Sequence, residues 1–199
     1  MKKLTHKNYK KSYYTTLNYS NYLEREIKYF KFCEELVDFL PKIKLLSPTT
    51  KLLDYGCALG FLVKSFRELG YNCDAYDISK WTKAQCIKRG IEYIEFKKSN
   101  YDLMLCLDVL EHMTNEQIKD LFNTIQSTHI LVRIPCSTNG GKSFHLDISN
   151  NDPTHINCKN KQEWFKLFET MGYTNRIPLN LYTIYDTNGV LCYIFSKNQ

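Results

Sequence analysis

The sequence predicts an α/β fold with a mostly parallel central sheet, helices on both faces and an antiparallel hairpin at the C-terminal end. Short apolar, strand-like runs alternate with amphipathic helical segments, as in parallel sheets that helices cover on both sides. The 199 residues, 43% hydrophobic and 24% charged, suit one globular domain. We therefore expect a basic, tyrosine-rich N-terminal segment over residues 1–19 and a single domain over residues 20–199.

The predicted helices share an apolar stripe with helical spacing. They span residues 20–40, 61–69, 79–89, 114–125 and 160–171. Capping residues support their starts: Asn21 with Glu24 and Thr114 with Gln117 form capping-box patterns, and Ser79 and Asn160 are further N-cap candidates. Leu23 and Ile27 belong to the apolar stripe that we expect on the first helix.

The predicted strands are short apolar runs between these helices. They span residues 51–55, 72–76, 91–96, 101–107, 129–134, 181–185 and 190–195. The last two flank Asp-Thr-Asn-Gly at 186–189, a turn sequence typical of a β-hairpin, so they should pair antiparallel. The third run is followed by only a few residues before the fourth. A parallel crossover needs a dozen or more residues, so we expect this strand to be stunted and its following helix to be absent.

Composition narrows the environment and the partners. No apolar run is long enough for a transmembrane helix and the N-terminus lacks the apolar core of a signal peptide, so we expect the cytoplasm, either of a bacterium or of a host cell if the protein is viral. The eight cysteines include no C-x-x-C pair and should be buried thiols rather than zinc ligands. The net charge of +6 includes Lys2, Lys3 and other N-terminal lysines. We interpret these as solvated, which makes nucleic acid an unlikely partner.

A glycine-containing turn between the first strand and the next helix is the most informative segment. It reads Leu-Asp-Tyr-Gly-Cys-Ala-Leu-Gly over residues 53–60. Glycine permits a tight turn and close backbone approach to a ligand, and the helix N-terminus adds N–H donors. Asp77 ends the second strand 23 residues after Asp54. A carboxylate at that place can accept hydrogen bonds from both ribose hydroxyls of a nucleoside cofactor.

The chain resembles the class I S-adenosylmethionine (SAM)-dependent methyltransferases. Residues 53–60 look like their first motif, residues 76–79 like their ribose-binding strand end, and residues 101–112 like their fourth strand and its turn. The resemblance runs from about residue 20 to residue 197. It implies a Rossmann-like methyltransferase fold, SAM as the cofactor and S-adenosylhomocysteine as the product.

The resemblance also assigns expected roles at the cofactor site. Asp54 would orient the turn or the methionine ammonium, Asp77 would hold the ribose, and Ile78 would lie against adenine. The expected cofactor-binding residues are Asp54, Gly56, Cys57, Ala58, Gly60, Asp77, Ile78, Leu107 and Asp108. Ala58 stands where many members have glycine. The acid that usually contacts adenine after the third strand is not evident.

A long polar loop at residues 136–159 follows the fifth predicted strand and should face the acceptor. His145 and His155 each have an aspartate two or three residues away, so either could be a general base, with Asp108 in reserve. A structural role for the loop is equally favoured. Compact ligand spacing is missing, so we expect no metal site. Glu111 and His112 precede a capped helix, and we expect them to tie down the turn.

A shorter resemblance concerns the acceptor. Asp-Pro-Thr-His-Ile-Asn at 152–157, Glu-Trp-Phe at 163–165 and Gly-Tyr at 172–173 look like methyltransferases found with glycosyltransferases in bacterial and large-virus surface-glycan pathways. It implies a sugar or glycan hydroxyl as acceptor and a glycosyltransferase as partner. The alternatives are another small metabolite, RNA or protein as acceptor, or a binding subunit without catalysis. The tyrosines at 13, 14, 19 and 22 could form a lid over the cofactor, although ordinary packing is the favoured interpretation.

Overall fold

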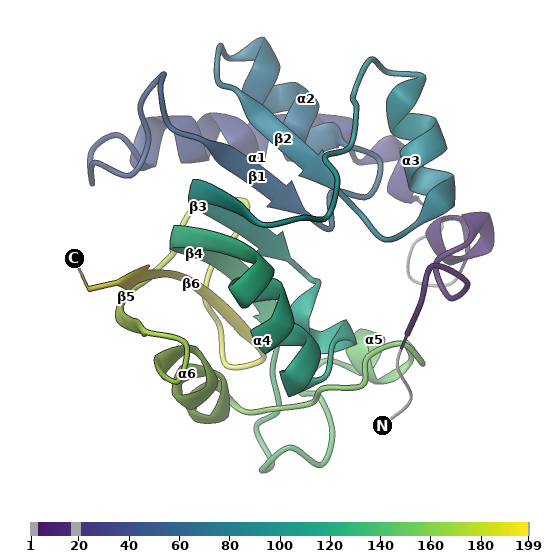
Figure 1. Ribbon diagram of the computed structural model, residues 1–199. Coiled ribbons are helices and arrows are strands. Elements are labelled where there is room, and N and C mark those ends of the chain that lie inside the picture. The colour runs from purple at the N-terminus through teal and green to yellow at the C-terminus, as the bar shows by residue number, and fades with distance from the viewer. Residues whose placement is uncertain (1–3, 17–20, 199) are drawn as a thin grey trace.

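The computed structural model describes residues 4–16 and 21–198. In this part of the chain, strands form one sheet in the order β2-β1-β3-β4-β6-β5 (Figure 1). The strands are β1 (Leu52–Tyr55), β2 (Cys73–Tyr76), β3 (Ser99–Leu107), β4 (Ile125–Pro135), β5 (Tyr173–Pro178) and β6 (Val190–Lys197). The first four are parallel, whereas β6 pairs antiparallel with both β4 and β5. This architecture confirms the predicted fold class.

Helices cover both faces of the sheet (Figure 1). The α-helices are α1 (Glu26–Phe39), α2 (Phe61–Glu68), α3 (Lys80–Ile87), α4 (Asn115–Thr124), α5 (Asp147–Asn150) and α6 (Lys161–Glu169). Buried side chains of α1, α2 and α3 pack on one face, against residues such as Leu52 and Leu103. Those of α4 and α6 pack on the other, against Leu53 and Met104. Because neighbours in a strand point to opposite faces, both sides of the sheet are apolar.

Short 3-10 helices complete the structure near the carboxyl ends of the strands. They are η1 (Lys11–Tyr14), η3 (Tyr22–Glu24) and η4 (Leu110–His112). Every helix among the described residues is too short or too polar to cross a bilayer.

Three predicted helix starts are confirmed. Thr114 and Gln117 form a reciprocal capping box at α4, Asn160 and Glu163 do so at α6, and the Ser79 hydroxyl accepts the Thr82 N–H at α3. These caps satisfy N–H groups that have no partner inside the helix.

The first helix differs from its prediction. It begins at Glu26 rather than near residue 20, and the Asn21 side chain accepts hydrogen bonds from Arg25 instead of capping the helix. Leu23 and Ile27 are 51% and 72% exposed. The predicted stripe was therefore wrong at its N-terminal end, because the helix packs through Phe32, Cys33 and Leu36, which lie on another part of its surface.

Two strand predictions also change. Residues 91–96 contribute only an isolated bridge between Tyr93 and Ala75, and no helix separates them from β3, as expected from the short spacing. At the C-terminal end the pair is antiparallel, but the partner of β6 is Tyr173–Pro178 rather than residues 181–185. The edge strand at 173–178 buries only Tyr173. Its sequence therefore lacks the alternation of apolar and polar residues that marks a half-buried strand.

Candidate active site

The turn after β1 carries the strained backbone that the glycine pattern predicts. Gly56, Ala58 and Gly60 all have positive φ, at 86°, 47° and 72°. The N–H groups of Gly56 and Cys57 donate to the Tyr76 carbonyl at 2.7 and 3.0 Å, which joins the ends of β1 and β2. Ala58 thus adopts a left-handed conformation, which costs an alanine about 1–2 kcal/mol.

Asp77 fastens this turn from the neighbouring strand end. Its Oδ2 accepts the Ala58 N–H at 2.9 Å, and its Oδ1 accepts the Ser79 N–H at 2.7 Å. Burial raises the pKa of Asp77 to about 6, against the lowering effect of these two backbone donors. A carboxylate offers about four lone-pair positions, so two remain for ligand hydroxyls.

Asp54 lies deeper than the resemblance implied. It is 4% exposed, and burial followed by the charge of Asp77 raises its pKa to about 7. With Cys57 it lines a small inner cavity behind Gly56, of about 30 Å³. Gly60 also contacts protein rather than open space, since a Cβ there would lie 2.7 Å from Ile91 Cδ1. These positions shape the turn from within.

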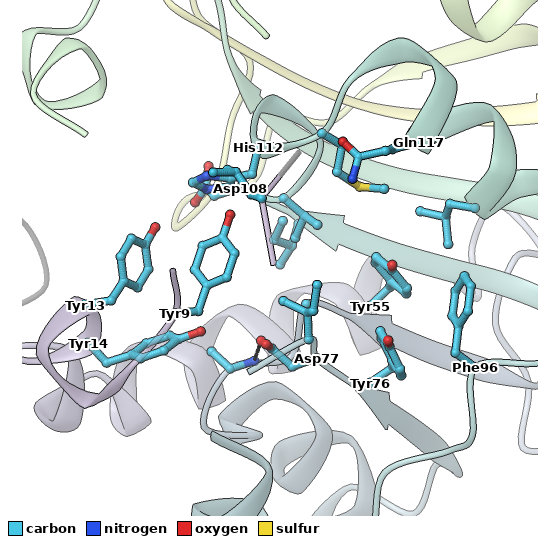
Figure 2. A pocket seen from close by; sticks show the side chains of 18 of the residues that line it. Tyr9, Tyr13, Tyr14, Tyr55, Tyr76, Asp77, Phe96, Asp108, His112 and Gln117 are labelled. Carbon is cyan, nitrogen blue, oxygen red and sulfur yellow. Dashed lines mark hydrogen bonds between the residues drawn. The ribbon is translucent and has the colours of Figure 1, made fainter. Parts of the chain in front are cut away.

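A cavity of about 360 Å³ opens in front of the turn, within the size range of small-ligand sites. Its wall includes the remaining predicted cofactor residues: Gly56, Ala58, Asp77, Ile78, Leu107 and Asp108. Figure 2 shows Tyr55, Tyr76 and Phe96 on one side of Asp77, with Tyr9, Tyr13, Asp108 and His112 on the other. The cavity therefore joins an aromatic end to a polar end across the turn.

The aromatic residues at this end of the cavity were not predicted from the sequence. The rings of Tyr55 and Tyr76 stack at 5.1 Å, and Phe96 lies 5.3 Å from Tyr76. Each tyrosine stands at the last position of its strand, immediately before Gly56 or Asp77, and this placement is the sequence signal that could have located them. Phe96 is 45% exposed because no helix covers the loop before β3.

The N-terminal segment forms part of the polar end. The Ser79 hydroxyl donates to the Tyr9 carbonyl at 2.6 Å, and Tyr14 stacks on Trp81 at 5.4 Å. Both tyrosines line the cavity. Of the predicted N-terminal features, Lys2, Lys3 and Tyr19 lie outside the described residues, as does the predicted boundary at 19–20. The described part is packed onto the domain, which gives the lid hypothesis a concrete geometry.

Replacing Tyr14 by alanine should raise the Kd for SAM about tenfold, chiefly through faster dissociation. Tyr14 is 5% exposed and closes one wall of the cavity, so its loss opens a route for the cofactor to leave. Stopped-flow dissociation and calorimetry measure the effect. Tyr182, which is 92% exposed and outside the cavity, is the matched control. Identical dissociation rates in wild type and Tyr14→Ala would make the segment ordinary packing.

The structure separates the three candidate bases. His145 lies outside the cavity: its ring packs on the backbone of Gly189, where a Cβ would lie 2.6 Å from His145 Cδ2. His155 lies behind the cavity wall, with its side chain 7% exposed. Asp108 lines the cavity and forms an ion pair with Arg133, whose pKa it raises. Only Asp108 among the three is on the cavity surface.

His112 is the histidine that faces the cavity, and the structure gathers Glu111 and His155 beside it. The Nε2 atoms of His112 and His155 lie 3.9 and 3.8 Å from Glu111 Oε1. The Glu111 carbonyl accepts the N–H groups of Ile156 and Asn157, at 3.0 and 2.9 Å. The polar loop therefore docks on η4, as the turn-fastening role for Glu111 requires, although its backbone rather than its carboxylate makes these bonds. Burial lowers the pKa of His112 to about 4.

Comparison with known proteins identifies the family. A family model described as a methyltransferase domain matches residues 23–176. The chain belongs to this methyltransferase family. The match includes the glycine turn, Asp77 and Asp108, and it confirms the methyltransferase expected from the sequence. No curated protein matches the sequence.

Solved structures share the fold at low identity. A SAM-dependent methyltransferase from Archaeoglobus fulgidus has a TM-score of 0.61 at 15% identity, over 88% of this chain and 99% of that one. Magnesium protoporphyrin IX methyltransferase from Synechocystis, solved with bound SAM, has a TM-score of 0.61 at 15% identity, over 98% of both chains. The mitomycin 7-O-methyltransferase has a TM-score of 0.56 at 12% identity, over 86% of this chain and 54% of that one. SAM is thus the cofactor of the methyltransferase fold that this chain adopts.

Proposed function

We propose that this methyltransferase transfers the methyl group of SAM to a hydroxyl group of a sugar or glycan. The observation that carries the proposal is the continuity of one cavity. It joins the cofactor turn at Gly56 and Asp77 to a polar wall that includes Asp108, His112 and Tyr9. Methyl transfer needs the electrophile and the acceptor aligned in one space, and this cavity is continuous from the cofactor turn to the polar wall.

The residues present fit the cofactor. The turn offers close backbone approach, and Asp77 keeps two lone-pair positions that can accept ribose hydroxyls. Ile78 and Phe96, each 45% exposed, give an apolar surface for adenine at the aromatic end. This apolar contact would compensate for the missing adenine-contacting acid. Leu107 and Asp108 remain for the methionine end, with Asp54 acting through the turn.

Bound SAM supplies a methyl group on a positively charged sulfur, which needs an aligned and deprotonated acceptor. We assign proton acceptance to Asp108. Arg133 engages its Oδ2, which orients the carboxylate and leaves Oδ1 for an acceptor hydroxyl. Asp108 holds φ at 55°, an uncommon conformation for a residue other than glycine and one associated with functional sites. His145 and His155 lack this access to the cavity.

A hydroxyl acceptor suits the polar wall. Tyrosine hydroxyls and an imidazole can both donate and accept hydrogen bonds, which a polyhydroxylated sugar needs. The short resemblance to methyltransferases of surface-glycan pathways favours the same acceptor. A screen of SAM-dependent methyl transfer to nucleotide sugars, oligosaccharides, small phenols and tRNA tests the proposal. Turnover confined to tRNA or to phenols would replace the sugar with that class.

With the acceptor from this screen, Asp108→Asn should lower kcat by about 10²–10⁴-fold, the contribution of a positioned base. The Kd for SAM should change less than threefold, because the amide keeps the shape of the carboxylate. His145→Ala is the matched comparison and should retain near-wild-type kcat, since its ring lies outside the cavity. The opposite pattern, with the loss in His145→Ala alone, would return the base to the polar loop.

A further inference from the structure

The methyltransferase mechanism leaves one buried cluster without a use. The Glu111 side chain is fully buried, and neither of its carboxylate oxygens has a hydrogen-bond partner. The two ring nitrogens of His155 are likewise buried without a hydrogen bond, although the Ser149 carbonyl is near enough to affect its pKa. Buried polar atoms without hydrogen bonds are costly, so this cluster is a place where a further binding partner would be favourable.

The spacing of the cluster indicates what that partner is. Glu111 Oε1 lies 3.9 Å from His112 Nε2 and 3.8 Å from His155 Nε2. One ligand atom from each of the three residues lies within 4.8 Å of the others. These separations are too long for hydrogen bonds. Three ligands about 2.1 Å from a tetrahedral zinc ion lie about 3.4 Å apart, so each carboxylate–histidine pair would close by about 0.5 Å and the histidine pair by up to about 1.4 Å to complete such a site.

The surroundings already orient the histidines as metal ligands. His112 Nδ1 lies 3.0 Å from the Thr154 carbonyl and 2.9 Å from the Thr154 hydroxyl, so Thr154 fixes the orientation of the imidazole ring. Asp152 fixes Thr154 in turn: its Oδ1 accepts the Thr154 N–H at 2.8 Å and the Thr154 hydroxyl at 2.6 Å. Metal-binding histidines in proteins are held by partners of this kind.

The cluster also adjoins the acceptor end of the cavity. His112 lines the cavity, whereas Glu111 and His155 lie behind it, so an ion held by all three would sit at the cavity wall. The ring centroids of His112 and His155 are 4.6 Å apart. Two histidines and one glutamate leave a fourth tetrahedral position, which catalytic zinc sites give to water or substrate.

We propose that Glu111, His112 and His155 bind a divalent transition-metal ion of the zinc type, and that the open position takes the acceptor oxygen. The ion-binding part stands alone, and the acceptor part rests on the proposed function. A metal-bound hydroxyl has a lower pKa. Its O–H bond would break with the proton passing to Asp108. A bond from the acceptor oxygen to the methyl carbon would then form as the carbon–sulfur bond of SAM breaks, with the electron pair staying on sulfur.

This inference departs from the absence of a metal site that the sequence predicted. The three ligands are 44 residues apart at their widest, with only Glu111 and His112 adjacent. Of the neighbouring loop residues, Asp152 Oδ2 lies 3.6 Å from His155 Nε2, whereas His145 packs on Gly189 away from the cluster. Docking of residues 156 and 157 on the Glu111 carbonyl is what delivers His155.

Metal binding is tested directly on the full-length chain. Protein stripped with a chelator is titrated with Zn²⁺ by calorimetry and with Co²⁺ by visible absorption, which distinguishes four-coordinate cobalt from the free ion. We expect one ion per chain and the intense bands of a four-coordinate site. No saturable binding, or binding that gives only the octahedral cobalt spectrum, would overturn the proposal.

Variants assign the ligands. Glu111→Gln and His155→Ala should each weaken Zn²⁺ binding at least about 100-fold, whereas His145→Ala, a histidine of the same loop, should bind as wild type. Thr154→Val keeps the carbonyl but removes the hydroxyl that lies 2.9 Å from His112 Nδ1 and donates to Asp152, so it should weaken binding about tenfold. Glu111→Gln keeps the shape of the buried side chain without its acid group, so the metal-free variant should melt close to metal-free wild type, and Zn²⁺ should no longer raise its Tm. Wild-type affinity in Glu111→Gln contradicts the site.

The two proposals fail differently. One Zn²⁺ per chain together with no methylation of any hydroxyl acceptor would keep the metal site and remove the proposed function. Methylation of a sugar hydroxyl by protein that binds no metal would support the proposed function and contradict the metal site. Addition of Zn²⁺ to stripped protein should restore turnover without changing the Kd for SAM, since the aromatic end with Tyr55 and Phe96 lies across the cavity from His112 (Figure 2).

Discussion

Replacing Gly56 by alanine should reduce SAM affinity at least about 100-fold and destabilise the fold by about 2–5 kcal/mol. Gly56 has φ +86°, and a Cβ there would lie 2.3 Å from Val109 Cγ2. Left-handed strain contributes about 1–2 kcal/mol and overpacking about 1–3 kcal/mol. Moving the turn to relieve the clash would also break the bond from the Gly56 N–H to the Tyr76 carbonyl. Thermal unfolding and calorimetry measure the two effects.

Gly70 provides the control for backbone strain alone. It has the same φ of +86°, but a Cβ there would have nothing within 4 Å. Gly70→Ala should therefore destabilise by only about 1–2 kcal/mol, with SAM affinity unchanged. Combining Gly56→Ala with Val109→Ala should recover the steric part of the loss and leave the part due to φ. If Gly56→Ala and Gly70→Ala behave alike, the close packing against Val109 has no functional weight.

Asp77→Ala should weaken SAM binding by about 1.5–3 kcal/mol, or about 10–150-fold, the scale of hydrogen bonds to a charged group. The variant loses the proposed ribose contacts and also the acceptor of the Ala58 and Ser79 N–H groups. Calorimetry gives the affinity. Thermal unfolding without SAM shows how much of the loss comes from the turn itself.

Asp77→Asn and Asp74→Ala bracket this result. The asparagine keeps one carbonyl oxygen for a backbone N–H or a ribose hydroxyl, so its affinity should fall between those of Asp77→Ala and wild type. Asp74 belongs to the same strand but bonds to the Tyr101 hydroxyl and lies outside the cavity. Its replacement should leave SAM affinity unaffected. Full affinity in Asp77→Ala would remove this residue from the ribose site.

The sequence by itself determined the features that depend on neighbouring residues. Strand and helix periodicity predicted the alternating elements, and the caps at Ser79, Thr114 and Asn160 located three helix starts. The glycine turn could be predicted because the backbone conformation of a residue depends mainly on that residue and its neighbours. The spacing before β3 likewise predicted a stunted third strand, since chain length alone limits what can form there.

Other features depended on packing between distant segments and were set only by the tertiary structure. Periodicity cannot say which side of a helix meets the core, and the stripe expected at Leu23 and Ile27 is exposed. Edge strand β5 was missed because it buries only Tyr173. Two backbone hydrogen bonds to the Glu111 carbonyl hold His155 beside His112, whereas His145 packs on Gly189. A cluster assembled by loop docking has no sequence spacing to recognise, so only the folded chain could show which histidine faces the cavity.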